Sequence, residues 1–176
     1  MQHSSFLLLD ANVIIYLFKI GIWDKLVQCS RLQVARTVLD VEAHFYEDDR
    51  GQRCDFDLKQ YVDSSAIQIV DCSLNKVNNF ISQFDRSYAE KLDPGEAESL
   101  AYLLDAPRPT QICSADAIVF RVLGNLDRGE QGRSLEEVLQ SAGLSRRLPR
   151  QYCRKFREDY TAKGVEERMY GRGLKR

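Results

Sequence analysis

Short apolar runs alternate with helical patterns along most of this 176-residue chain. The first run, Phe6–Leu9, is continuous and stops at Asp10, which is typical of a strand buried on both faces. Three further runs of this kind are Leu32–Ala35, Ile67–Val70 and Thr110–Cys113. Strands that alternate with helices predict a parallel sheet covered by helices, because parallel strands need long crossover connections. We therefore expect an α/β fold, with three α/β/α layers around a central, mostly parallel sheet of four or five strands.

Capping signals indicate where several helices begin. Asp93 precedes Pro94, and Glu96 follows at the third helical position, which predicts a helix that Asp93 caps. Ser134 and Glu137 form the same kind of capping box. The remaining expected elements are helices over 13–20 and 23–29, a helix capped by Thr37, a helical turn over 57–63, a helix capped by Ser73, a helix over 115–123 that ends at Gly124, and loops over the polar stretches 47–55 and 127–133, where no fifth strand is evident.

The composition indicates a cytoplasmic globular protein without a membrane segment. Hydrophobic residues make up 44% and charged residues 29% of the chain, an ordinary balance for a globular domain. The longest apolar run, 6–18, is interrupted by Asp10 and Asn12 and is shorter than a membrane span of roughly 20 residues. No basic segment precedes it, so we do not interpret it as a signal peptide. The five cysteines contain no CxxC pair, which favours free thiols over disulfides or a zinc cage.

The charges are divided unevenly between an acidic body and a basic tail. Residues 1–144 contain 14 Lys/Arg and 22 Asp/Glu, whereas residues 145–176 contain 11 Lys/Arg and 4 Asp/Glu. We therefore divide the chain into a domain over 1–144 and a basic helical extension over 145–176. A cluster of arginines where the extension begins is expected to contact nucleic-acid phosphates, and its members are Arg146, Arg147, Arg150, Arg154 and Arg157.

The extension is also expected to pack on the body. Residues 151–163 predict one helix, followed by a frayed end. Tyr152, Phe156 and Tyr160 recur every four residues and would share one face of it. Docking through this face leaves the basic face free for a polyanion.

Two acids directly follow predicted strands. Asp10 follows the first strand and Asp116 follows the fourth. In open parallel sheets, ligands bind beyond the carboxyl ends of the strands. Each acid also has a structural interpretation. Asp10 could cap the next helix, although Asn12 is a good cap and would leave Asp10 free, and Asp116 could simply stabilise the start of its own helix.

Three further acids lie in helical patterns. Glu42 belongs to the helix after the second strand, with Asp40 as a weaker substitute. Glu96 and Glu98 flank the apolar stripe of the Pro94 helix, about 160° apart around its axis. The capping box explains Glu96 structurally, and we expect only one of the two glutamates to face the strand ends.

Taken together, these segments resemble the PIN-domain ribonucleases. The stretches LLLDANVIIYLF, TVLDVEAHF, PGEAESLAYLL and ICSADAIVFRVL have the order and spacing of that family over roughly residues 5–125. The chain is most similar to the branch whose third acid lies in a GEAE-like helix start. The resemblance implies Asp10, Glu42, Glu96 and Asp116 as catalytic metal ligands, supported by Asn12, Ser114 and Glu98. The chain departs from the family at Ala115, where many members carry an additional acid, and in lacking an evident fifth strand.

Converging carboxylates repel one another, and a hard divalent cation relieves that repulsion. Oxygen ligands alone favour Mg²⁺ or Mn²⁺. Such an ion polarises a phosphate and activates a water, so no covalent nucleophile is required. The resemblance implies cleavage of single-stranded RNA to a 5′-phosphate and a 3′-hydroxyl. It also raises a toxin-like role with a cognate inhibitor protein, and homo-oligomerisation is a further possibility.

Two other classes of protein compete with this interpretation. An aspartyl phosphatase also begins with a strand that ends in Asp, but a second Asp usually follows two residues later, where this chain has Asn12. A nucleic-acid-binding or partner-binding module without catalytic activity is the more serious alternative. Metal-dependent cleavage by the intact protein would distinguish it from a nuclease.

Overall fold

The four apolar runs form neighbouring strands of one parallel sheet. The computed structural model describes residues 6–106 and 110–175. In it, the sheet has five strands in the order β5–β2–β1–β6–β7, and every neighbouring pair is parallel. The strands are β1 Leu7–Leu9, β2 Leu32–Ala35, β5 Ile67–Val70, β6 Gln111–Cys113 and β7 Gly132–Arg133. Leu8 lies opposite Gln33 on one side and Ile112 on the other. The predicted fold class is confirmed.

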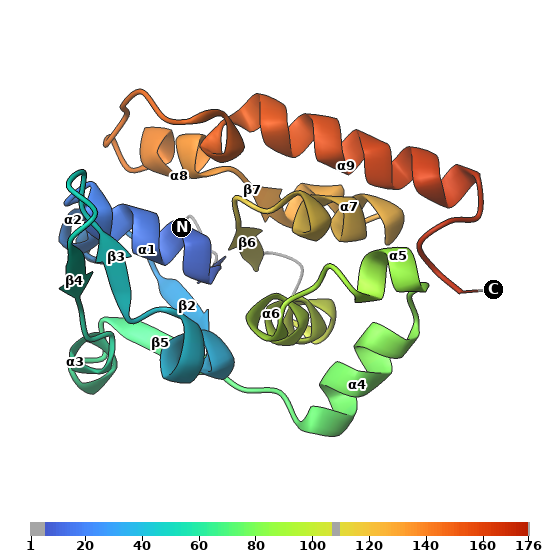
Figure 1. Ribbon diagram of the computed structural model, residues 1–176, viewed down its shortest axis with the longest axis horizontal. Coiled ribbons are helices and arrows are strands. Elements are labelled where there is room, and N and C mark those ends of the chain that lie inside the picture. The colour runs from blue at the N-terminus through green and yellow to red at the C-terminus, as the bar shows by residue number, and fades with distance from the viewer. Residues whose placement is uncertain (1–5, 107–109, 176) are drawn as a thin grey trace, which may run out of the picture.

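Helices cover both faces of this sheet (Figure 1). On one face lie α1 Ala11–Lys19, α2 Trp23–Cys29 and α3 Lys59–Asp63. On the other lie α6 Pro94–Asp105 and α7 Ala117–Asn125, with α4 Leu74–Ser82 and α5 Arg86–Ala89 beside them. The core fills the space between these layers and includes the fully buried Leu8, Val34 and Ile112. None of the helices in the described ranges is long and apolar enough to span a bilayer.

Both polar stretches that were expected to be loops contain short strands. In the second, β7 pairs with β6 and supplies a fifth strand to the sheet. In the first, β3 Phe45–Glu47 and β4 Arg53–Asp55 form an antiparallel hairpin. These strands are two or three residues long and partly exposed, so they lack the apolar run that marks a buried strand. The expectation of loops was therefore wrong at both places.

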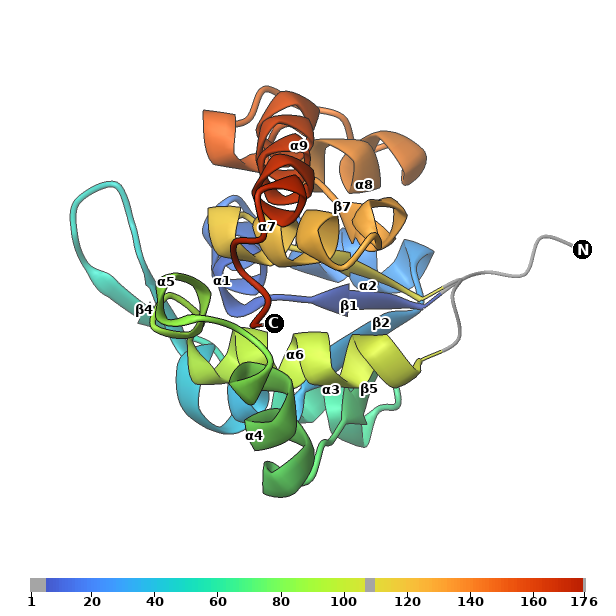
Figure 2. The ribbon, with the colours of Figure 1, turned by 90° about the vertical axis from the view of Figure 1, so that its right-hand side faces the viewer.

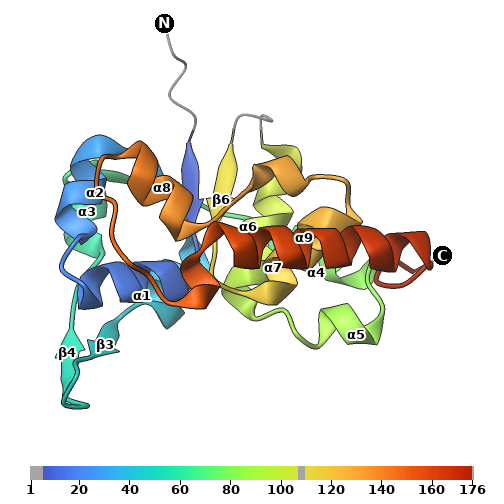
Figure 3. The ribbon, with the colours of Figure 1, turned by 90° about the horizontal axis from the view of Figure 1, so that it is seen from above.

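The hairpin lies at the carboxyl ends of the parallel strands. In Figure 3 the N-terminus leads into the near end of β1, and the β3–β4 hairpin projects beyond the opposite end. Because all five strands are parallel, that opposite edge collects the residues that follow β1, β2, β5 and β6. The acids predicted at strand ends therefore share one edge.

The extension packs on α7 through its helix, α9 Arg154–Met169, which Figure 2 shows nearly end-on above α7. Two glycines make the close approach possible. A Cβ on Gly164 would lie 2.1 Å from the Arg121 carbonyl oxygen, and one on Gly124 would lie 2.1 Å from the Thr161 carbonyl oxygen. Gly124 was expected to end its helix, but α7 continues to Asn125, so the glycine serves this contact.

The extension also differs at its two ends from the expected helix over 151–163. Arg150–Tyr152 forms a separate 3-10 turn before α9, and α8 Leu135–Ser141 precedes both. The end is held rather than frayed. Lys175 donates its backbone N–H to the Gln83 carbonyl at 2.8 Å, and Gly173 donates its N–H to Asp85 Oδ2 at 2.8 Å.

A largely buried ion pair joins the two helices as well. Arg121 on α7 lies 2.7 Å from Glu167 on α9, and both side chains are at most 15% exposed. The Tyr88 hydroxyl donates a hydrogen bond to the same carboxylate. Of the predicted aromatic stripe, Phe156 packs edge-on against Phe120 of α7. Tyr152 is buried in the turn before α9 and stacks on Tyr16 of α1 instead.

Candidate functional site

Asp10 lies at the end of β1, where it is 1% exposed. Its Oδ1 accepts the Ala11 N–H at 2.8 Å, so Asp10 is the N-cap of α1. Its Oδ2 accepts a hydrogen bond from the Ser114 hydroxyl at 2.7 Å. Asn12, which was expected to be the cap, is instead the second residue of the helix and is exposed. Asp10 therefore both caps a helix and faces the neighbouring strand end.

Asp116 lies beside it at the end of β6. It is the N-cap of α7, and its Oδ1 accepts the Ile118 N–H at 3.0 Å. Its own backbone N–H donates to the Ser114 hydroxyl oxygen at 3.0 Å. Ser114 thus links Asp10 and Asp116 across two adjacent strands, in the supporting position that was expected of it.

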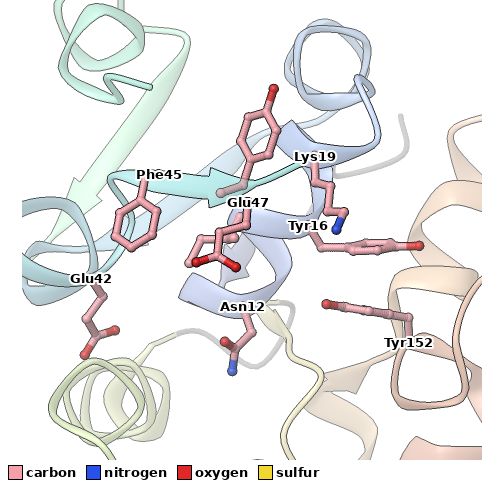
Figure 4. Close-up of a pocket in the computed structure, with 9 residues that line it drawn as sticks. Asn12, Tyr16, Lys19, Glu42, Phe45, Glu47 and Tyr152 are labelled. Carbon is pink, nitrogen blue, oxygen red and sulfur yellow. The ribbon is translucent and has the colours of Figure 1, made fainter. Parts of the chain in front are cut away.

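Glu42 reaches the same edge from the segment after β2. It ends a π-helical turn, Val38–Glu42, and its Oε1 accepts the Gly95 N–H at 2.8 Å (Figure 4). A Cβ on Gly95 would lie 2.1 Å from Glu42 Oε2, so only glycine permits this approach without displacing the carboxylate. Asp40, the weaker candidate, is exposed and lies 4.0 Å from the Arg36 guanidinium.

The two glutamates of α6 are both buried, with exposures of 1% for Glu96 and 4% for Glu98. Glu96 belongs to the predicted capping box: its Oε2 accepts the Asp93 N–H at 3.1 Å. Glu98 accepts the backbone N–H groups of Thr37 at 2.8 Å and Cys72 at 3.1 Å. It therefore joins the segments that follow β2 and β5, and Thr37 is held by this bond rather than acting as a side-chain cap.

The expectation that only one glutamate would face the strand ends was wrong. Glu96 faces the end of the sheet that carries Asp10 and Asp116, whereas Glu98 faces the ends of β2 and β5. Both Glu98 oxygens are already bound to backbone N–H groups. Glu96 is therefore the better placed of the two to bind a cation.

Asp93 is a fifth carboxylate at this site, and the sequence interpretation gave it only a capping role. Its Oδ1 accepts the Glu96 N–H at 2.7 Å. Its charge also raises the pKa values of Asp10, Glu42 and Glu96. The sequence could have indicated Asp93 as a site residue through its place in the capping box with Glu96, because both side chains of such a box lie at the helix N-terminus.

Burial and mutual repulsion disfavour the charged forms of the carboxylates Asp10 and Glu96 at this edge of the sheet. Burial raises the pKa of Asp10 to about 7, against the effect of the Ser114 hydrogen bond. Burial, together with repulsion from Asp10, Asp93 and Asp116, raises the pKa of Glu96 to about 9. The N-termini of α1, α6 and α7 meet here, and their partial positive charges offset part of this repulsion.

Comparisons with protein-family models, curated proteins and solved structures found no match. The PIN resemblance therefore rests on the four sequence motifs and on the arrangement of their acids.

The site has features that suit a hard cation. Glu42 Oε2 and Glu96 Oε1 are buried and have no hydrogen-bond partner among the described residues. Buried anionic oxygens without a partner are costly unless they are protonated or bind a cation. Yet in residues 6–106 and 110–175, no group of three acidic, histidine or cysteine side chains is arranged to hold a metal ion as it stands. The residue types and the unpartnered oxygens fit Mg²⁺ or Mn²⁺.

The five predicted arginines occupy different environments. Arg147 and Arg150 are exposed, and Arg146 is exposed while donating to the Ile20 carbonyl at 3.1 Å. Arg157 is only 17% exposed and lies 2.8 Å from Glu137. Arg154 is more exposed and lies 3.5 Å from the same carboxylate. Three of the five side chains are therefore open to solvent and not part of an ion pair with Glu137.

Proposed function

We propose that this protein is a metal-dependent endoribonuclease of the PIN type that hydrolyses single-stranded RNA. One observation carries the proposal: Asp10, Glu42, Glu96 and Asp116 come from four separate segments and meet at the carboxyl edge of a parallel sheet. Burial and carboxylate repulsion raise the pKa values of Asp10, Glu42 and Glu96, and these raised values together with the unpartnered oxygens of the two glutamates support a role in binding a cation. Structural capping accounts for some of their contacts, but not for two fully buried acids, Asp10 and Glu96, beside the half-buried Glu42 and Asp116.

In this proposal the four acids hold Mg²⁺ or Mn²⁺ through their carboxylate oxygens. The bound ion would polarise the scissile phosphate and lower the pKa of a coordinated water. Ser114 is a positioning residue, because it fixes Oδ2 of Asp10 and the start of α7. Gly95 positions Glu42 by leaving room for its carboxylate. Glu98 holds the segments after β2 and β5 in place and takes no direct part.

The exposed Arg146, Arg147 and Arg150 are proposed to attract the RNA backbone, since the body of the protein is acidic.

A toxin-like role would need an inhibitor protein that covers the four acids at the carboxyl ends of the strands. Val41 precedes Glu42 and is 68% exposed, which offers such a partner, or a second copy of the chain, an apolar contact. The five unpaired cysteines are consistent with the proposed cytoplasmic location.

The test is a cleavage assay on a panel of RNAs with Mg²⁺, Mn²⁺ or EDTA. We expect internal cleavage of unpaired RNA with either metal, products that carry 5′-phosphates, and no cleavage in EDTA. Metal-independent cleavage that survives in Asp10→Asn would identify a contaminating nuclease. RNA binding without cleavage under any of these conditions would contradict the proposal.

That last outcome would favour the second candidate, a nucleic-acid-binding module without catalytic activity. The observation on its side is that no three side chains of the described residues already form a metal-binding group. A metal titration followed by thermal melting separates the two candidates, because a ligand that binds the folded state raises the Tm. A Tm that does not change with Mg²⁺ or Mn²⁺ would favour the binding module.

A further inference from the structure

A pocket of about 400 Å³ has Glu42, one of the four proposed metal ligands, in its wall (Figure 4). Its walls come from α1, from the segment Glu42–Glu47 and from Tyr152 of the C-terminal extension. Glu42 and Asn12 line it. Glu42 is a proposed metal ligand, and the family resemblance gave Asn12 a supporting role beside the ligands. The pocket and the proposed reaction site therefore share a wall. The volume is at the lower end of the about 300–1,000 Å³ of small-molecule sites, which suits a single nucleoside rather than a helix.

Aromatic rings form much of the pocket. Tyr16 and Tyr152 stack with their centroids 4.1 Å apart and their planes 16° apart, which makes one end of the pocket a fixed aromatic wall. Phe45 lies across from it and is 37% exposed. The Arg53 guanidinium lies over the Phe45 ring, 4.1 Å from its centroid. A ring that is held on one face by a guanidinium and is still exposed is suited to stack a planar group on its other face.

The polar groups of the pocket select against a phosphate. Glu42 and Glu47 both line it and would repel an anion. Lys19 also lines it, but its ammonium lies 3.5 Å from Asp49 Oδ1 and is already part of an ion pair. A neutral planar group meets no such repulsion.

The same polar groups suit the edge of a nucleobase. The Asn12 amide offers one acceptor and two donor hydrogens, and the Glu47 carboxylate offers acceptors only. A carboxylate accepts readily from an exocyclic amino group, which adenine, cytosine and guanine carry. Uracil has no such group and can offer the carboxylate only its single ring N3–H. The pocket should therefore bind uracil more weakly than the other three bases.

We propose that this pocket is a subsite for one unpaired nucleobase of the RNA strand, with the adjoining phosphate at the carboxylates. The inference rests on the proposed function and adds the recognition step. A base can enter such a pocket only when it is unstacked and unpaired, so the subsite would restrict the substrate to single-stranded regions. Tyr152 belongs to the extension, so the extension completes the subsite as well as carrying the arginines.

The test measures RNA binding in EDTA, where the proposed cleavage does not occur. The probe is a short fluorescein-labelled single strand, compared with strands of the same length that carry one abasic residue at successive positions. We expect the wild-type protein to bind at least one abasic strand about fivefold to a hundredfold more weakly, as loss of one stacked base implies. Competition with the neutral nucleosides adenosine, cytidine, guanosine and uridine should find uridine the weakest competitor.

Phe45→Leu is the decisive variant, because it keeps the apolar bulk and removes the aromatic plane. Its binding of the intact strand should fall to that of the abasic strand, while its melting curve stays near that of the wild type. Glu47→Gln should reduce the discrimination against uridine, because its amide can donate as well as accept. Tyr170→Ala is the matched control, because Tyr170 is 68% exposed at the far end of α9 and should leave both properties unchanged (Figure 1).

Equal binding of intact and abasic strands by the wild type would overturn the subsite. So would a Phe45→Leu protein that still distinguishes intact from abasic strands together with a Glu47→Gln protein that still disfavours uridine. A separate cleavage assay with Mg²⁺ keeps the two proposals apart. Cleavage without any dependence on the base at one position retains the nuclease and rejects the subsite. Base-dependent binding that is lost in Phe45→Leu, in a protein that cleaves nothing, retains the subsite and rejects the nuclease.

Discussion

Ser114 donates its hydroxyl hydrogen to Oδ2 of Asp10 at 2.7 Å and accepts the Asp116 N–H at 3.0 Å. One hydroxyl therefore connects the ends of β1 and β6 and fixes the acids that follow both strands. The Asp10 carboxylate is held from its other side by the Ala11 N–H. Its remaining lone pairs can still bind a cation, because a carboxylate has about four acceptor positions.

Asp10→Asn should therefore retain the fold and lose most metal-dependent cleavage. Asparagine can keep the oxygen that accepts the Ala11 N–H, but it lacks the negative charge. We expect cleavage to fall by more than about a hundredfold, and Ser114→Ala to reduce it by about 10- to 100-fold through misplacement of Asp10. Circular dichroism with a Mg²⁺ cleavage assay checks both variants. A folded Asp10→Asn protein with wild-type cleavage would rule out the metal site.

Glu96→Gln and Glu98→Gln should separate the catalytic from the structural glutamate. In Glu96→Gln, the amide oxygen can still accept the Asp93 N–H, so the capping box survives while cleavage is lost. Glu98→Gln places an amide NH₂ against the N–H of Thr37 or Cys72. The unsatisfied buried group should cost about 1–3 kcal/mol of unfolding free energy. Denaturant unfolding and cleavage assays measure the two effects. If Glu98 were the ligand, Glu98→Gln would lose cleavage and Glu96→Gln would lose only stability.

Gly95→Ala should impair cleavage with little loss of stability. Its methyl group would meet the Glu42 carboxylate, which lies at the end of a flexible side chain and can swing away. Glu42 would then leave the Gly95 N–H, and the site would lose one acid. We expect a loss of cleavage close to that of Glu42→Gln and a Tm within a few degrees of the wild type. If Gly95→Ala cleaves normally while Glu42→Gln does not, this account of how Glu42 is positioned is wrong.

The metal-free protein should become less stable as the pH rises from about 5 to about 9. Burial raises the pKa of Asp10 to about 7, and burial with carboxylate repulsion raises that of Glu96 to about 9. Each group then binds more protons in the folded than in the unfolded chain, so the unfolding free energy falls between the unfolded and folded pKa values. Melting curves in EDTA should show this fall, and Glu96→Gln should show a shallower one. Mg²⁺ should restore the Tm most strongly at high pH, and a Tm that rises with pH throughout this range would contradict the prediction.

Reversing the charges of Arg146, Arg147 and Arg150 to Glu should weaken RNA binding and its salt dependence. If all three contact phosphates, the slope of log binding constant against log salt concentration should become shallower by about 2, because each contact on a single strand contributes about 0.7. The control reverses Lys163, Arg172 and Lys175, which changes the net charge equally at exposed positions in the C-terminal half of α9 and beyond it. Arg157→Glu is unsuitable, because it would break the ion pair with Glu137. Equal effects of the two triple variants would indicate attraction by net charge alone.

Local sequence patterns predicted the features that depend on neighbouring residues. The four apolar runs became β1, β2, β5 and β6 within one residue at their boundaries. The boxes Asp93–Glu96 and Ser134–Glu137 formed as expected, because each is closed by groups three residues apart. The placement of Asp10 and Asp116 at one edge also followed from the sequence, since all strands of a parallel sheet end on the same side.

The tertiary structure decided what depends on segments far apart in the chain. The sequence could not show that Glu98 would hold Thr37 and Cys72, because those contacts span 61 and 26 residues. From the sequence, Gly124 was expected to end a helix, and only the packing of α9 against it shows why a glycine is needed there. From the sequence, Arg157 was expected to be free to contact phosphates, whereas in the structure it lies 2.8 Å from Glu137. Periodicity and capping act over one or two turns of chain, whereas the partner of a buried charge or a close-packed glycine is fixed only when distant segments meet.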